Sequence, residues 1–220
     1  MPTIEEARDW YPLSEPVHGF DHVLRVYRLA ERLAQAEDAD VEIVRAAVLL
    51  HDAQPAVKKG SAGPAPQGEE SRAKHQHTSA EFARQILLAE GWPEERIAAV
   101  QHCIRAHRFR DDSEQPQTLE AKVLFDADKL DAIGATGVAR AVAYAARAGQ
   151  PFFAWTSERF IQTGDREPGE PYSSYHEYIF KLHKLKDRLY TASAREIAAG
   201  RHRFLEAFYE QLADEMRGEV

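Results

Sequence analysis

The chain of 220 residues contains a single cysteine, Cys103, and no long apolar run. One cysteine cannot form a disulfide within the chain, so we expect a reducing compartment, the cytoplasm. No stretch approaches the roughly 18 consecutive apolar residues that a membrane helix needs. The first six residues, MPTIEE, lack the basic and apolar segments of a signal peptide. We therefore expect a protein that neither spans nor enters a membrane.

The sequence also lacks the signals of β-structure and of repeat proteins. It shows no alternating strand pattern, no Asn-Gly or Asp-Gly hairpin turn and no repeat of fixed period. The formal net charge of -8 argues against stable binding to nucleic acid or to anionic membranes. Hydrophobic residues make up 44% of the chain, which excludes wholesale disorder. The length fits a single domain over residues 1–220.

Apolar residues recur at helical spacing along most of the chain. The pattern predicts helices over 20–36, 41–52, 75–91, 93–107, 118–130 and 138–147, and two more between 175 and 216 that are separated near Thr191. Asp40 is suited to cap the second helix, and Pro93 to occupy the first position of the fourth. Proline and glycine predict irregular segments over 53–73 and 150–173. The predicted fold is all-α, with a core over about 18–150 and C-terminal helices over about 174–217 packing on it.

Histidine is the residue in excess, with ten in the chain and seven between positions 18 and 107. Histidines and carboxylates gather at the ends of predicted helices, next to apolar runs, where charge is costly unless it is paired or bound to metal. Imidazole and carboxylate without thiolate suit a divalent Mn, Mg, Fe, Co, Ni or Zn ion. The residues concerned are His22, His51, Asp52, Asp126, Asp128 and Asp131.

Each of these groups alone has an ordinary structural interpretation. A single histidine on an amphipathic helix is usually a surface or hydrogen-bonded residue, and three aspartates in six residues usually form a solvated helix face. The combination at several helix ends is what favours a metal site. The remaining histidines at 75, 102, 176, 183 and 202 need no function, and Cys103 is most simply a small buried residue.

Three separated motifs resemble a known family. His22, the segment LLHD at 49–52 and the segment ADKL at 127–130 match the H…HD…D signature of the HD superfamily of metal-dependent phosphohydrolases. The segments HGFDHVLRV at 18–26 and DADKLDAIGA at 126–135, with the tail 181–201, resemble a bacterial subgroup of that family. The resemblance covers about residues 18–215 and implies an HD-domain helical bundle. It implies the metal ligands His22, His51, Asp52 and Asp128, with Asp126 and Asp131 supporting them or capping the helix end.

Some members of this superfamily hold a second metal with further histidines. His77 and His107 lie roughly where such ligands occur, and we expect them to bind either a second ion or a substrate phosphate. The Gly-Tyr-Pro element of the cyclic-dinucleotide branch is absent, because RFRD at 108–111 follows His107. Hydrolysis of a cyclic dinucleotide is therefore not expected.

The resemblance implies attack of metal-activated water on a nucleotide or a related small phosphate ester, with nucleoside triphosphate pyrophosphohydrolase as the leading activity. A phosphomonoesterase or 5'-nucleotidase, a non-catalytic nucleotide-binding regulatory module and a diiron oxygenase stay open as alternatives, as do a monomer and a homodimer. Cationic groups must meet the charge that develops on phosphate. The candidates for substrate contact or catalysis are His18, Arg25, Arg105, Arg108 and Lys129, with Glu70 as an acid or base.

Overall fold

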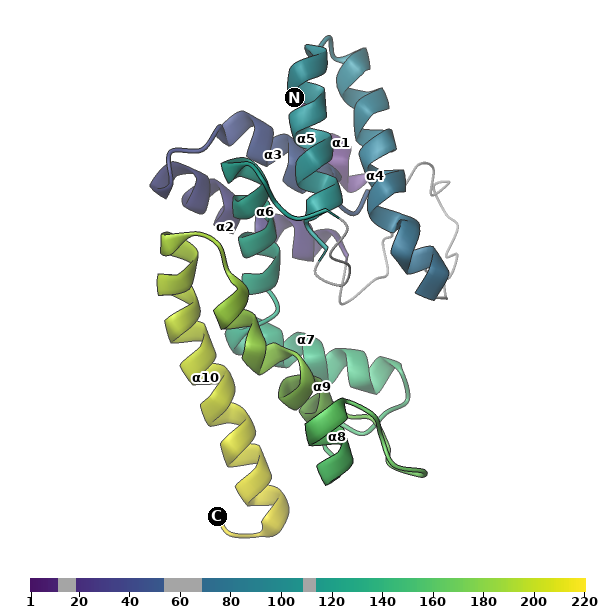
Figure 1. Cartoon of the computed structure of the whole chain (residues 1–220), viewed down its shortest axis with the longest axis vertical. Coiled ribbons are helices and arrows are strands. Elements are labelled where there is room, and N and C mark those ends of the chain that lie inside the picture. The colour runs from purple at the N-terminus through teal and green to yellow at the C-terminus, as the bar shows by residue number, and fades with distance from the viewer. Residues whose placement is uncertain (12–18, 54–68, 109–113) are drawn as a thin grey trace. The chain divides into compact units, whose positions relative to one another are not determined.

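The computed structural model describes residues 1–11, 19–53, 69–108 and 114–220, and of residues 69–75 it describes the backbone alone. Every regular element within these ranges is a helix (Figure 1), which confirms the all-α prediction. None of the described helices is long and apolar enough to cross a membrane. The chain divides into two compact units, residues 1–128 and 129–220. A single domain with the C-terminal helices packed on the first ones stays a prediction.

The first unit is built around helix α3. Its elements are α1 (Ile4–Arg8), α2 (Phe20–Ala36), α3 (Val41–Leu50), α4 (Glu69–Ala89), α5 (Glu94–Ala106) and α6 (Leu119–Leu130), whose last residues extend into the second unit. Helix α4 lies along α5, and α3 contacts both α2 and α5. Figure 1 shows α3 among these helices.

The sequence of α3 explains its central place. The carboxylate of Asp40 accepts hydrogen bonds from the backbone N–H groups of Glu42 and Ile43, which confirms the predicted cap. The apolar residues from Ile43 to Leu50 are all buried, on every side of the helix. A helix that is apolar all round must be surrounded by protein. Its C-terminal end therefore lies inside the unit, and His51, which follows it, is fully buried.

The predicted helix bounds hold for α2 and differ by a few residues elsewhere. Pro93 is the N-cap of α5 rather than its first helical residue. Helix α4 begins at Glu69, six residues before the predicted start. Helix α7 begins at Gly134, four residues early. The apolar pattern marks only the buried part of a helix, so polar or glycine-containing first turns escape it.

The second unit contains α7 (Gly134–Arg147), α8 (Glu158–Thr163), α9 (Ser174–Phe180), the 3-10 helix η1 (Leu182–Arg188) and α10 (Ala192–Arg217). Helix α10 packs against α7 and η1. Thr191 is the N-cap of α10, as predicted. Helix α8 lies in a segment that we expected to be irregular.

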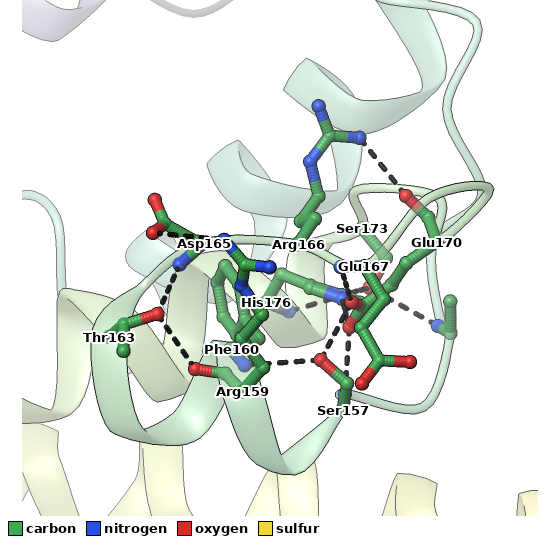
Figure 2. A network of polar contacts seen from close by, with 11 residues as sticks. Ser157, Arg159, Phe160, Thr163, Asp165, Arg166, Glu167, Glu170, Ser173 and His176 are labelled. Carbon is green, nitrogen blue, oxygen red and sulfur yellow. Dashed lines mark hydrogen bonds and ion pairs between the residues drawn. The ribbon is translucent and has the colours of Figure 1, made fainter.

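A polar network around Glu170 organises residues 157–176 (Figure 2). The Glu170 carboxylate accepts hydrogen bonds from the backbone N–H and the hydroxyl of Ser157, each at 2.7 Å, and from the backbone N–H of Glu167. Nε2 of His176 lies 3.0 Å from the same carboxylate, and Nδ1 lies 2.8 Å from Oγ of Ser173. This Ser-His-Glu arrangement resembles a hydrolytic triad. Ser173 and His176 are fully buried, however, so the network is structural.

Candidate metal centre

The centre begins with a histidine and an aspartate from two helices of the first unit. His22 lies in the first turn of α2, where its backbone N–H donates to the Gly19 carbonyl, and its side chain is 1% exposed. Its Nε2 lies 3.3 Å from Oδ1 of Asp128 in α6. The structure therefore brings together these two residues, which are more than a hundred positions apart in the sequence.

His51 is the C-cap residue of α3 and points its second ring nitrogen at Asp52. Nδ1 lies 2.7 Å from the carbonyl oxygen of Val48, which fixes the proton on Nδ1 and leaves the lone pair on Nε2. Nε2 is buried, lies 3.5 Å from Oδ2 of Asp52 and meets no hydrogen-bond partner among the described residues. A buried acceptor without a partner is costly unless another group binds it. A divalent cation meets that need.

Burial also sets the charge of His51. It lowers the pKa of His51 to about 4, against the opposing charge of Asp52 and together with the neighbouring His107 ring. The imidazole is therefore neutral at pH 7. Neutral imidazole is the form that binds a transition metal.

His107 repeats this geometry at the end of α5. It is the C-cap residue of that helix, and its Nδ1 is hydrogen-bonded to the carbonyl oxygen of Ile104. Its Nε2 lies 3.5 Å from Oδ1 of Asp52. The rings of His51 and His107 stand 5.1 Å apart at an interplanar angle of 85°. The Asp52 carboxylate thus faces one imidazole with each oxygen.

The donor set fits one divalent ion. One ligand atom each from His22, His51 and Asp52 lies within 4.8 Å of the other two. Atoms bound to one ion at about 2.1 Å stand at most about 4.2 Å apart, so small side-chain movements bring the three atoms into one coordination sphere. The carboxylates of Asp52 and Asp128 are 22% and 17% exposed, whereas the three imidazoles are buried. The centre is therefore accessible on its carboxylate side.

Helix α4 meets the centre with residues that the sequence did not single out. His77 is exposed and is outside this group of ligand atoms. Its neighbours Gln76 and Ser79 are buried instead. The hydroxyl of Ser79 donates to the carbonyl oxygen of Ala53 at 2.9 Å, directly after Asp52. A hydroxyl and an amide carry no ligand signature, so only packing identifies these two residues.

The basic candidates are held by different partners. Arg25 pairs with Asp21 on the same helix at 2.7 Å. Arg105 binds both carboxylate oxygens of Glu114, at 3.1 and 2.8 Å, which neutralises its charge. Arg108, next to His107, donates to the amide oxygen of Gln76 at 3.2 Å. Lys129 is half-buried in the last turn of α6.

The remaining residues that the sequence singled out lie apart from this group of ligand atoms or outside the described residues. His18 lies outside the described residues, as does the side chain of Glu70. Asp126 is fully buried in α6, and Asp131 pairs with Arg140 at 2.8 Å in the second unit. Burial raises the pKa of the Cys103 thiol, which fits the structural role expected of it.

Tyr11 is a further residue beside the centre that the sequence did not single out. Its side chain is 4% exposed, and its hydroxyl donates to the carbonyl oxygen of Leu49 at 3.0 Å. Its ring packs against that of Phe20, with centroids 5.6 Å apart. A single tyrosine outside any helical pattern gives no signal in the sequence, apart from the adjacent aromatic Trp10.

The chain is similar to a known protein family and to several solved structures. The family model for the HD domain matches residues 19–133. YpgQ of Bacillus subtilis is 31% identical over 221 aligned residues, covering 97% of this chain and 94% of YpgQ. The crystal structure of YpgQ in complex with ADP superposes with a TM-score of 0.70 at 29% identity, covering 99% of this chain and all of that one. An HD-superfamily hydrolase from Bacillus thuringiensis superposes with a TM-score of 0.63 at 28% identity, covering 91% and 87%.

Proposed function

The chain belongs to the HD domain family, with the fold of HD-superfamily hydrolases, and on this premise we propose that it is a metal-dependent phosphohydrolase. We propose that His22, His51, Asp52 and Asp128 hold one divalent ion. We propose a nucleotide as substrate, and cleavage of a nucleoside triphosphate to pyrophosphate as the leading reaction.

One observation carries the proposal: the buried, unpartnered Nε2 of His51 beside the Asp52 carboxylate. Nδ1 is committed to Val48, so the ring cannot turn without losing a buried hydrogen bond. Orientation of a ligating histidine by a backbone carbonyl is a general feature of metal sites. The neutral state of His51 and the proximity of Asp128 to His22 support the same assignment.

A divalent ion in this place would supply Lewis acidity and a water molecule that ionises near neutral pH. The chain's own residues orient the substrate around it. In the reaction, a P–O bond to the leaving group breaks, the water oxygen bonds to phosphorus, and the leaving oxygen takes up a proton. We assign His107 to the phosphate side, where its Nε2 can pass a proton to the leaving oxygen. We assign Arg108, its neighbour, to the charge on the remaining phosphate oxygens.

The choice of a nucleotide rests on similarity. YpgQ was crystallised with ADP, and its chain is similar to this one over nearly its whole length. A phosphomonoesterase would act on the same kind of ligand but would release phosphate. The product therefore separates the two activities.

The test combines metal analysis with a product assay on the full chain. We would measure metal that copurifies with the protein and then assay nucleoside mono-, di- and triphosphates with Mn²⁺, Mg²⁺, Co²⁺ or Ni²⁺ for release of phosphate and pyrophosphate. We expect metal-dependent release that is lost in His51→Gln and Asp52→Asn while the helical circular dichroism persists. His183→Gln, a half-buried histidine of η1 hydrogen-bonded to the Tyr178 carbonyl, is the matched control and keeps full activity.

The outcomes separate the alternatives. Release that survives His51→Gln and Asp52→Asn would refute the assigned site. Tight nucleotide binding without turnover would favour the regulatory module. Consumption of oxygen by an iron-loaded protein would favour the oxygenase.

A further inference from the structure

Tyr11 connects the N-terminal segment to the backbone that carries His51 and Asp52. Its hydroxyl donates to the Leu49 carbonyl oxygen at 3.0 Å. The backbone N–H of Asp52 faces the same phenol oxygen. One hydroxyl therefore joins the last turn of α3 to the amide of a proposed ligand.

The last carbonyl groups of a helix have no partner within the helix, and buried ones need a donor from elsewhere. At the end of α3 three consecutive carbonyls each have a different donor. The His51 ring donates to the Val48 carbonyl, and the Tyr11 hydroxyl donates to the Leu49 carbonyl. The backbone N–H of Ala53 donates to the Leu50 carbonyl. Without the hydroxyl, the Leu49 carbonyl would be buried beside the centre and would lose this hydrogen-bond donor.

The segment before Tyr11 is itself firmly placed. Thr3 and Glu6 form a reciprocal capping box at the start of α1. The N-terminal amine lies 2.7 Å from the Glu90 carboxylate, and the Trp10 ring meets the Phe82 ring edge-on at 5.5 Å. The last two contacts hold residues 1–11 against α4 and the residue that follows it. The contacts of residues 1–11 and the packing of the Tyr11 ring on Phe20 therefore position the hydroxyl.

The ring of Tyr11 also contacts the other segment that supplies a proposed histidine ligand. Phe20, which packs on the Tyr11 ring, lies two residues before His22. The same side chain thus touches both segments that supply histidine ligands.

We propose that Tyr11 is a positioning residue of the metal centre, and that its hydroxyl fixes the backbone that presents His51 and Asp52. The proposal rests on the proposed function, because it takes those two residues as ligands. It extends the centre to a residue before position 19, where the HD-domain match begins.

The test removes the Tyr11 hydroxyl and measures the affinity for Mn²⁺, independently of catalytic activity. Mn²⁺ is titrated into the full-length wild type and Tyr11→Phe, and bound ion is followed by loss of the free Mn²⁺ signal in electron paramagnetic resonance. We expect Tyr11→Phe to weaken Mn²⁺ binding about tenfold, as loss of outer partners of metal ligands does. Exchange of the Asp52 amide hydrogen, followed by NMR in the metal-free protein, should quicken about fivefold because the phenol oxygen that faces this amide is gone and the last turn of α3 is held less firmly.

The matched control is Tyr209→Phe, which removes the hydroxyl of a buried tyrosine that stacks on Tyr178 in the second unit. It should leave Mn²⁺ affinity and Asp52 exchange within twofold of wild type. Thermal unfolding of both variants reports any general loss of stability.

Two results would overturn the proposal. Mn²⁺ affinity and Asp52 exchange that stay within twofold in Tyr11→Phe would leave the hydroxyl a purely structural role. If the Asp52 amide of the wild type exchanges as fast as an exposed amide, this backbone is not fixed, and the proposal is refuted without any variant. Failure of the wild type to bind Mn²⁺ would contradict the proposed ligands, whereas Mn²⁺ binding without nucleotide hydrolysis would contradict only the proposed activity.

Discussion

Nε2 of His107 lies 3.5 Å from Oδ1 of Asp52, so an imidazole from α5 faces the carboxylate that the proposed ion needs. His51 faces the other oxygen of that carboxylate at the same distance. The two histidines differ in their place within the cluster, because His51 is grouped with His22 and Asp52, and His107 is outside that group. This difference predicts different effects of substitution.

We expect His107→Gln to lower kcat about a hundredfold, as loss of a proton-transferring group does, and to leave Mn²⁺ affinity within about threefold of wild type. His51→Gln should abolish Mn²⁺ binding. Steady-state kinetics and Mn²⁺ titration on both variants check the prediction. Equal loss of Mn²⁺ binding in the two variants would instead make His107 a ligand.

Two arginines at the C-terminal end of helix α5, Arg105 in its last turn and Arg108 just after it, predict a second contrast. Arg108→Met should raise KM about tenfold or more, since a hydrogen bond to a charged group is worth about 1.5–3 kcal/mol. Arg105→Met should leave KM unchanged and lower the free energy of unfolding by about 1 kcal/mol or less, because its partner is the half-exposed Glu114. Kinetics and urea unfolding of the pair measure both effects. A larger KM effect in Arg105→Met would reverse the assignment.

Much of the fold was accessible from the sequence because burial and helical period coincide. In α2 and α3 the buried apolar residues run from near one end of the helix to the other, so the pattern and the helix have nearly the same limits. Helix α8 is six residues long and gave no such pattern. Its single buried residue, Phe160, is placed by His176 and Tyr172 further along the chain, which periodicity cannot register.

Part of the candidate site could likewise be predicted from the sequence, and part could not. His22, His51, Asp52 and Asp128 carry chemistry that a sequence motif records. His77 carries the same chemistry but is exposed, because its neighbour Gln76 takes the buried side of α4. Tyr11 and Ser79 act through hydrogen bonds to main-chain carbonyls, and any sequence offers carbonyls everywhere. Only the folded chain shows which ones lie beside the centre.

Glu170 predicts an acid-sensitive contribution to stability. Partial burial pushes the pKa of Glu170 upward, but hydrogen bonds from Ser157, Glu167 and His176 outweigh it and lower the pKa to about 2. A folded-state pKa below the unfolded value means that the unfolded chain binds the proton first. The contribution is therefore complete above about pH 4.5 and is lost as pH falls toward 2.

Urea unfolding at pH 7, 5, 4 and 3 measures this dependence. Glu170→Gln should be less stable than the wild type at pH 7, and the difference should shrink as the pH falls from 4.5 to 3. Glu167 is exposed, and only its backbone N–H donates to the Glu170 carboxylate. Glu167→Gln should therefore have the same free energy of unfolding as the wild type at each pH. A difference that is independent of pH would show that the carboxylate charge contributes nothing.

Two helical glycines predict opposite signs of stability change for the same substitution. A Cβ atom at Gly137 in α7 would lie 2.3 Å from the carbonyl oxygen of Ala132, a backbone atom that cannot move aside alone. A Cβ atom at Gly200 in α10 would meet nothing within 4 Å. We expect Gly137→Ala to lower the free energy of unfolding by about 2–3 kcal/mol, within the range for overpacking. Gly200→Ala should raise it by about 0.5–1 kcal/mol, because alanine loses less backbone entropy in a helix.

Urea unfolding at pH 7 compares the two variants directly. The shared chemistry of the substitution cancels the intrinsic preference of alanine for helix, so the difference between them isolates the contact with Ala132. That contact closes the turn between α6 and α7, in the DADKLDAIGA segment that carries Asp128. Stabilisation by both substitutions would mean that the turn opens without cost, and the close approach would then have no role in holding the segment.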